Sequence, residues 1–276
     1  MIITFRHVDE EYYGVEEIVR PVAELTVIRP QFICIVCEIL NIFHTYSARL
    51  VSDVKKALKL NEYRLDKNDK AMLHMYCNLT NLIEDFYWNV VDDEFGRKIK
   101  AFNEKQYWQK GMRYPDKRLG QYRGLLFEEI VVAAVEKRYT EKRFCTGCQI
   151  YINSRRVIAL YGEGSASHKE TIDIAGWDDN AKYGEFYECK INPERFRNEN
   201  YRFFMELKKA LEVNGIQNYQ IGLVSADTME HLKAQKRYLE EQDESCKAEF
   251  MLIGREDIYN IQCSRMPELF SASTEE

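Results

Sequence analysis

The sequence has no apolar run long enough to cross a lipid bilayer. Its most apolar stretch, from Phe32 to Phe43, is interrupted by Glu38, whereas a membrane-spanning helix needs about 20 apolar residues. The N-terminus also lacks the order of basic, apolar and small residues that marks a signal peptide. We therefore expect a cytoplasmic protein with no membrane partner, and we interpret the apolar stretch as a core helix.

An excess of positive charge is also lacking. The chain has 39 lysine and arginine residues against 45 aspartate and glutamate residues, which gives a formal net charge of −6 at pH 7. Binding of nucleic acid by bulk electrostatics requires clustered lysine and arginine. Only two local clusters could serve that purpose, and a solvated helix or loop face is an equally good interpretation of each. They are Lys110, Arg113, Lys117, Arg118 and Arg123, and Arg195, Arg197, Arg202, Lys208 and Lys209.

The sequence has no glycine-rich phosphate-binding loop, which argues against a kinase, a dehydrogenase or a P-loop protein. Its eight cysteines do not make a disulfide scaffold in a chain of 276 residues, and we expect them to be reduced. Two pairs have C-x-x-C spacing. Cys34 and Cys37 lie in the apolar helical stretch, where we expect packing. Cys145 and Cys148 have no second ligand pair nearby, although a zinc site needs four ligands, and zinc there stays open.

The N-terminal half consists mainly of helical segments. The first 27 residues or so indicate no clear element. From Gln31 to Leu58 apolar residues recur at helical spacing, which predicts one long helix. A second helix starts after Asp66 or Asn68, either of which could cap it. A third covers Glu94 to Tyr107.

A domain boundary is predicted near residue 115. The stretch from Gly111 to Gly120 contains Pro115 and several basic residues, which is the composition of a linker. We expect residues 1–115 to form a mainly helical domain for dimerisation or partner binding, residues 116–265 to form a second domain, and residues 266–276 to form a tail.

In the second half the pattern changes to alternating helices and strands. A helix comes first, three strand-like segments follow, and helix, strand, helix and strand complete the order. We expect an α+β or α/β fold in which a mixed sheet is flanked by helices. The predicted segments are Leu119–Tyr139, Gln149–Tyr161, Thr171–Gly176, Glu185–Lys190, Arg197–Asn214, Tyr219–Ser225, Thr228–Glu240 and Glu249–Ile253.

Two of these strands carry charged residues that should meet. Side chains two apart in a strand share a face, so Glu188 and Lys190 project together. A hairpin folded about Asn180 and Ala181 sets Asp173 opposite Glu188. Opposed residues have Cβ atoms roughly 5 Å apart, where two carboxylates repel unless a cation lies between them. Oxygen ligands alone select a hard ion, Mg²⁺ or Mn²⁺.

Asp173 stands between Ile172 and Ile174, which we expect on the face opposite its carboxylate. A carboxylate on a core strand is unfavourable unless a partner binds it, and a metal ion is one such partner. The plainer alternative is an exposed strand with a chance Glu/Lys pair, because E-x-K occurs in most proteins.

A further acid, Glu128, lies on the helix before these strands. Its neighbours at helical spacing are apolar, so it lies on the sheet-facing side. A carboxylate there is costly unless it is paired or bound to a metal, although one at the edge of an apolar stripe can reach water. These neighbours are Gly124, Leu125, Val131, Val132 and Val135.

Together these residues resemble the PD-(D/E)xK, or restriction-endonuclease-like, nucleases. The resemblance covers about Gly120 to Ile253. It consists of Gly124-x-x-Phe127-Glu128 on a helix, Asp173 on a strand and Glu188-x-Lys190 on the next strand. Ile172 stands where the family has its proline. The residues do not identify a subfamily.

The resemblance implies a restriction-endonuclease-like core that hydrolyses phosphodiester bonds. It implies that Asp173, Glu188 and the backbone carbonyl of Cys189 bind the divalent cation, Mg²⁺ or Mn²⁺. Lys190 would position or help to deprotonate the attacking water, and Glu128 would hold a second metal or a metal-bound water. A metal and a lysine together supply the nucleophile and the charge stabilisation that this reaction needs.

Several further residues are candidates for contact with nucleic acid. His168, just before the aspartate strand, could touch the scissile phosphate, although a loop histidine is more often plain surface. The basic candidates are Arg118, Arg123, Arg195 and Arg197. Because the net charge is negative, we expect a partner subunit, such as an ATPase or a DNA-binding protein, to deliver DNA, or a homodimer to form.

The leading hypothesis is a metal-dependent endonuclease that cuts DNA in prokaryotic antiviral defence or DNA repair. An alternative is a nuclease-fold protein without catalysis that serves as an interaction module. Metal affinity at Asp173 and Glu188 discriminates between the two. A third possibility, cleavage of RNA, differs only in substrate. No feature of the sequence indicates recognition of the 2′-hydroxyl that distinguishes RNA from DNA.

Overall fold

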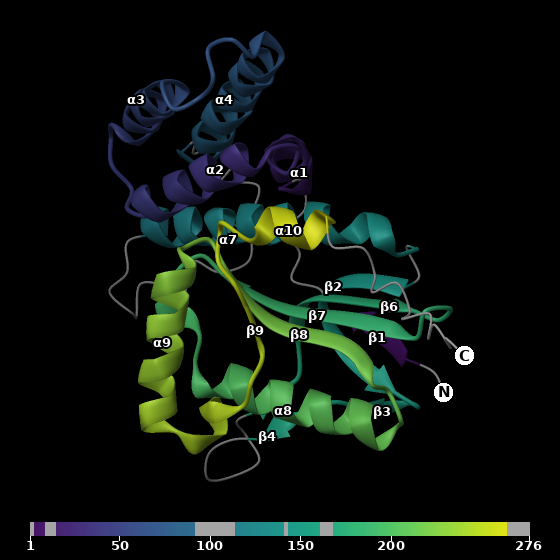
Figure 1. Ribbon diagram of the computed structural model, residues 1–276. Helices are drawn as coiled ribbons and strands as arrows, with labels where there is room; N and C mark the ends of the chain where they lie inside the picture. The colour runs from purple at the N-terminus through teal and green to yellow at the C-terminus, as the bar shows by residue number, and fades with distance from the viewer. Residues whose placement is uncertain (1–2, 9–14, 92–113, 141–142, 161–167, 264–276) are drawn as a thin grey trace, which may run out of the picture.

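The computed structural model describes residues 3–8, 15–91, 114–140, 143–160 and 168–263, which adopt a mixed α+β fold (Figure 1). These residues contain a seven-stranded mixed sheet with the strand order β1-β2-β6-β7-β8-β9, in which β3 pairs with β2. The expected fold class is therefore confirmed. The strands of this sheet are β1 (Ile3–His7), β2 (Phe144–Ile152), β3 (Arg155–Arg156), β6 (Ile172–Asp178), β7 (Tyr183–Lys190), β8 (Asn218–Ser225) and β9 (Met251–Ile253).

Helices cover both faces of the sheet. Figure 1 shows α7 and α10 over one face and α8 over the other, with α3 and α4 farthest from the sheet. A separate small sheet consists of β4 (Ala159–Leu160) and β5 (His168–Lys169). The helices are α1 (Glu16–Thr26), α2 (Pro30–Ile42), α3 (Leu50–Glu62), α4 (Lys70–Val91), α7 (Tyr114–Val135), α8 (Asn198–Val213), α9 (Met229–Gln242) and α10 (Ile258–Cys263). Among the described residues, no helix has the length and apolar character that a membrane span requires.

The prediction of one long helix from Gln31 to Leu58 is wrong, because α2 ends at Ile42 and α3 begins at Leu50. Contacts with distant parts of the chain interrupt it. The Asn41 side chain donates to the carbonyl oxygen of Ala226 (2.8 Å), and the backbone N–H of Tyr46 donates to Asp116 (2.7 Å).

The second predicted helix is confirmed as α4, but its cap is neither Asp66 nor Asn68. The Asp69 carboxylate accepts the N–H of Met72 at 2.8 Å, which satisfies a first-turn donor that has no partner within the helix. Asp66 instead accepts the N–H of Asn68. The predicted helix from residue 94 to residue 107 lies outside the described residues, as does the predicted tail.

The linker prediction is wrong from Tyr114 onward, because α7 begins there and runs to Val135. Pro115 lies in the first helical turn, where a proline removes no intrahelical hydrogen bond. Packing explains why α7 begins before Leu119, where the predicted helix begins, since Leu119 is buried in the core that α7 shares with the N-terminal helices. The division into domains at residue 115 stays a prediction.

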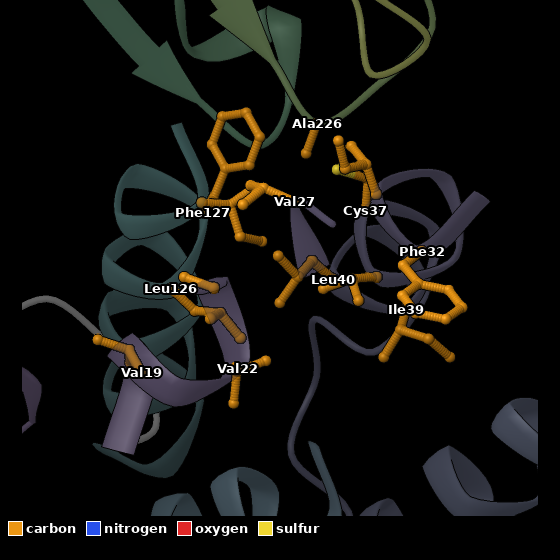
Figure 2. Packing of buried hydrophobic residues seen from close by; sticks show 14 of the residues in the cluster. Val19, Val22, Val27, Phe32, Cys37, Ile39, Leu40, Leu126, Phe127 and Ala226 are labelled. Carbon is orange, nitrogen blue, oxygen red and sulfur yellow. The ribbon is translucent and has the colours of Figure 1, made fainter. Parts of the chain in front are cut away.

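One hydrophobic core joins the N-terminal helices to α7 and to one face of the sheet. Figure 2 shows Val22 of α1, Leu40 of α2 and Leu126 and Phe127 of α7 packed in this cluster. A second core lies between the other face and α8, and includes Phe203.

The N-terminal segment also forms an edge strand of the sheet, which the sequence did not indicate. β1 pairs with β2 in antiparallel register from Ile3↔Ile152 to His7↔Cys148. Residues at the start of the chain thus extend the sheet built by its second half. The short helix α10 was likewise not predicted.

The β6–β7 hairpin confirms the predicted fold about Asn180 and Ala181. Its antiparallel register runs from Ile174↔Tyr187 to Asp178↔Tyr183. The Asp178 carboxylate closes the turn by accepting the N–H groups of Asn180 (2.7 Å) and Ala181 (2.9 Å). β8 and β9 then add in parallel after the helices α8 and α9, as expected for a mixed sheet.

Candidate active site

The structure brings Asp173, Glu188 and Lys190 to one point on adjacent strands. The β6–β7 register ends at Ile174↔Tyr187, and Asp173 and Glu188 are the next residues on the two strands. The Lys190 Nζ atom lies 2.9 Å from Asp173 Oδ2 and 3.0 Å from Glu188 Oε1. The ammonium group therefore stands between the two carboxylates.

Lys190 and the backbone around it satisfy most of the oxygens at this point. Asp173 Oδ2 also accepts the backbone N–H of Cys189 at 2.7 Å. Lys190 donates to the Cys189 carbonyl oxygen at 2.8 Å. The ammonium thus contacts one oxygen of each of the three groups that the resemblance assigns to a divalent cation.

Glu188 is held by two residues that the sequence did not reveal. Its side chain is only 2% exposed, and Oε1 accepts from Lys169 of β5 (3.1 Å) and from Asn200 of α8 (2.9 Å). Oε2 is buried and has no hydrogen-bond partner within the described part of the chain. Burying such an oxygen without a partner costs free energy.

One sequence signal could have identified Asn200. It lies four residues before Phe204, on the stripe of α8 that packs into the core, and a polar residue on an apolar stripe needs a partner. Lys169 has no such signal, because only the tertiary fold brings its side chain to Glu188.

Charge keeps Lys190 protonated. Burial alone would lower the pKa of its ammonium group, but the carboxylates of Asp173, Glu188 and Glu128 outweigh burial and raise this pKa well above its ordinary value. Lys190 is therefore a fixed cation at neutral pH.

Glu128 approaches from the α7 side, as predicted. It lines a cavity of about 500 Å³ together with Asp173. Gly124, one turn earlier, also lines this cavity, and nothing lies within 4 Å of where its Cβ would be. The cavity is therefore open along α7 up to the two acids. Its other walls come from α1, β1 and β2 and include His7, Val15, Val19, Thr146 and Gly147.

The predicted placement of Ile172 and Ile174 on one face is wrong. Ile172 packs into the core on the α8 side, and Ile174 packs into the core on the α7 side. The regular alternation of β6 is interrupted at Asp173, which lies across from Gly147. Gly147 has a φ of 50°, a conformation that breaks the pleat of β2. Asp173 can therefore border the cavity on the α7 side while it contacts Lys190.

The donor set fits a hard divalent cation in its chemistry. Asp173, Glu188 and the Cys189 carbonyl offer only oxygen, and among the residues that the structure describes the buried Glu188 Oε2 has no hydrogen-bond partner. Within the described ranges, no group of three or more His, Cys, Asp or Glu side chains is arranged to hold a metal ion. The ion would need Lys190 to release at least part of its three contacts.

The basic candidates divide into exposed and buried residues. His168, Arg195 and Arg197 are exposed, and His168 Nε2 lies 3.2 Å from Glu170. Arg118 and Arg123 are only 6% and 7% exposed, so their prediction as surface contacts is wrong. Arg123 donates to the Leu40 carbonyl oxygen of α2.

A second buried acid, Glu185, was also missed. It accepts hydrogen bonds from Arg138 (2.6 Å), Tyr139 (2.6 Å) and Tyr187 (2.9 Å). Arg138 and Tyr139 follow α7, so this network ties the end of that helix to the sheet. Gly176, paired with Glu185, leaves room for the Tyr139 ring, which would lie 2.5 Å from a Cβ there.

Comparison of the chain with models of protein families and with curated proteins finds no match. The resemblance to the PD-(D/E)xK nucleases therefore depends on the residues of the site and their order along the chain.

Proposed function

We propose that the protein is a metal-dependent endonuclease that hydrolyses phosphodiester bonds of DNA at the site formed by Asp173, Glu188 and Lys190. One observation carries this proposal. Two carboxylates and a lysine converge from adjacent strands, and a buried oxygen of one carboxylate, Glu188 Oε2, lacks a partner among the described residues. That oxygen is available to a metal ion.

Charge balance supports a site for a cation. Three carboxylates, those of Glu128, Asp173 and Glu188, face two lysines, Lys169 and Lys190. The excess is one negative charge, so an anionic phosphodiester is repelled unless a further cation binds. A bound Mg²⁺ or Mn²⁺ would stabilise the developing charge and make hydroxide available near neutral pH.

Each protein residue then has a distinct part. Asp173, Glu188 and the Cys189 carbonyl would hold the cation, with Asn200 fixing the orientation of the Glu188 carboxylate. Lys190 keeps its proton and offers positive charge to the phosphate in the transition state. Glu128 faces the same charge cluster from α7 and would bind a second ion or orient its water.

The route of the nucleic acid is proposed from the exposed basic residues. Arg195 and Arg197 immediately precede α8, whose first turn carries the Asn200 that binds Glu188. They and His168 are therefore the candidates for backbone contacts. Because the net charge is −6, we propose that a second copy or a partner subunit contributes the remaining phosphate contacts. A role in prokaryotic defence or DNA repair follows from this activity as part of the proposal.

The test is cleavage of supercoiled plasmid, linear duplex, single-stranded DNA and RNA with Mg²⁺, Mn²⁺ or EDTA. Asp173→Ala and Lys190→Ala should each lose at least about a hundredfold in rate, because each removes charge that stabilises the transition state. Lys233→Ala and Glu241→Ala, which change exposed charges on α9, are the matched controls. Metal-independent cutting, or cutting that both site variants retain, would overturn the proposal.

A non-catalytic interaction module is the second candidate, and one observation favours it. Lys169 and Lys190 already neutralise the buried Glu188, as in a structural ion-pair network. Calorimetry with Mn²⁺ separates the two functions. Absence of cleavage together with absence of Mn²⁺ binding supports the module, whereas Mn²⁺ binding without cleavage indicates a missing partner subunit.

A further inference from the structure

The C-x-x-C pair on β2 forms a thiol cluster that the proposed nuclease chemistry does not use. In a regular strand, residues three apart lie about 10 Å apart and on opposite faces. The positive φ of Gly147, 50°, breaks this alternation. As a result Cys145 and Cys148 both pack against the core on the α8 side.

The two thiols are in contact but differ in exposure. Cys148 is fully buried, whereas Cys145 is half-buried. Cys148 Sγ lies 3.8 Å from the Cys145 carbonyl oxygen and Cys145 Sγ lies 3.6 Å from the Thr146 carbonyl oxygen, and each thiol shifts the pKa of the other. This arrangement gives one thiol that solvent reaches and a second thiol beside it that solvent does not reach.

His7 completes the cluster from the neighbouring strand. It pairs with Cys148 in the β1–β2 register, and its Nδ1 atom lies 2.7 Å from the Thr146 carbonyl oxygen. The hydrogen bond from Cys148 lowers the pKa of Cys145 to about 7 against the opposing effect of burial, and His7 lowers it further. The same hydrogen bond and burial raise the pKa of Cys148. Because the thiolate is the reactive form, Cys145 is the nucleophile of the pair.

We propose that Cys145 and Cys148 form an oxidation site for hydroperoxides that closes to an intrachain disulfide. The Cys145 thiolate attacks one peroxide oxygen, the O–O bond breaks, and the other oxygen leaves as water or an alcohol after taking a proton. Cys145 is then a sulfenic acid. The Cys148 sulfur attacks it, the S–O bond breaks, and water leaves with the Cys148 proton. Two thiols are oxidised and one peroxide is reduced.

Closure should move the Thr146–Gly147 segment. A disulfide requires Cα atoms within about 7 Å, whereas residues three apart in a regular strand are about 10 Å apart, so this part of β2 should bend on oxidation. The Thr146 carbonyl oxygen is hydrogen-bonded to His7. The Gly147 carbonyl oxygen accepts a hydrogen bond from the Val8 N–H (3.0 Å). Both residues also line the cavity that Asp173 borders. Oxidation therefore reshapes that cavity, whatever reaction takes place there.

The test uses the full chain, reduced and then treated with hydrogen peroxide, with differential alkylation and peptide mass spectrometry. Trypsin releases both cysteines in one peptide, residues 144–155, so the disulfide appears as the loss of two hydrogen atoms that dithiothreitol restores. Cys77, exposed on α4, is the internal control. At pH 7 Cys145 should alkylate about tenfold faster than Cys77, because more of it is thiolate.

Two variants separate the steps. In Cys148→Ala the peroxide should leave a sulfenic acid on Cys145 that dimedone traps, and in Cys145→Ser the buried Cys148 should stay reduced. Circular dichroism verifies that both variants fold. The disulfide detected in the wild-type peptide does not depend on either variant. Alkylation of Cys145 no faster than that of Cys77, or disulfides that form only between molecules, would overturn the proposal. Protection of both thiols by one equivalent of Zn²⁺ would instead identify a metal site.

Discussion

Replacing Lys190 with methionine removes the cation that stands between two carboxylates and keeps most of the side-chain volume. In the wild type the ammonium contacts Asp173 Oδ2, Glu188 Oε1 and the Cys189 carbonyl oxygen, all within 3.0 Å. Methionine fills the space but leaves both carboxylates without this partner. Lys190→Met should therefore destabilise the fold.

The expected loss follows from the burial of the three side chains. Breaking a buried ion pair costs about 3–5 kcal/mol, because the remaining charge has no partner. Lys190 and Asp173 are 28% and 21% exposed, so solvent screens part of this cost, and Lys169 still neutralises Glu188. We expect a loss of about 2 kcal/mol in EDTA, below that range, because of this screening.

A divalent cation should reverse this loss. A ligand that binds only the folded state at a hundred times its dissociation constant stabilises it by about 2.7 kcal/mol. Urea denaturation of Lys190→Met, in EDTA and in saturating Mn²⁺, measures both quantities, and Lys233→Met on the exposed face of α9 is the matched control. Cleavage should stay absent in the variant even with Mn²⁺ bound, because the charge that faces the phosphate is gone.

Two results would refute this reasoning. Equal stability of Lys190→Met and the wild type in EDTA would mean that the lysine does not balance the carboxylates. A variant that is destabilised in EDTA but gains nothing from Mn²⁺ would mean that the oxygens bind the ammonium and no metal ion.

Three further predictions concern residues that the sequence did not reveal. Asn200→Ala should weaken Mn²⁺ binding about tenfold by calorimetry, because supporting residues orient metal ligands; unchanged affinity would remove Asn200 from the site. Gly176→Ala should lower the melting temperature by several degrees, since the new Cβ meets the Tyr139 ring. Gly215→Ala is not a valid control, because Gly215 has a φ of 74°, at which any side chain is strained. Burial, followed by the charge of Glu185, raises the pKa of Tyr139 above its ordinary value of 10.0. The contribution of Tyr139 to stability is therefore complete below pH 10 and is lost as the pH rises further. Between pH 8 and pH 11 the free energy of unfolding, measured with urea, should fall less for Tyr139→Phe than for the wild type.

The sequence predicted the parts of the site that depend on local rules. Strand alternation predicts Glu188 and Lys190 on one face, and the polar turn around Asn180 fixes the register of the hairpin, which ends one residue short of Asp173 and Glu188. Thr228, predicted as the start of a helix, caps α9 by accepting the N–H of His231. Such features involve residues close together in the chain.

The errors come from contacts between residues far apart in the chain. β1 is a strand because it pairs with β2, more than half the chain away, and its five residues are too few to identify a strand on their own. The break between α2 and α3 depends on Ala226 and Asp116. Arg118 and Arg123 resembled a surface cluster because only the fold shows that both are buried, and that Arg123 contacts Leu40 of α2.

The position of Asp173 links the candidate active site to the thiol pair. Asp173 lies across from Gly147, whose positive φ both interrupts the pleat beside the acid and brings Cys145 and Cys148 to one side of the sheet. A regular strand in place of Thr146–Gly147 would separate the two thiols and would set Ile172 and Ile174 on the same face. One local departure from strand geometry therefore gives Asp173 its access to the cavity and brings the two thiols to one side of the sheet. A structural change at the thiol pair should therefore alter the surroundings of Asp173.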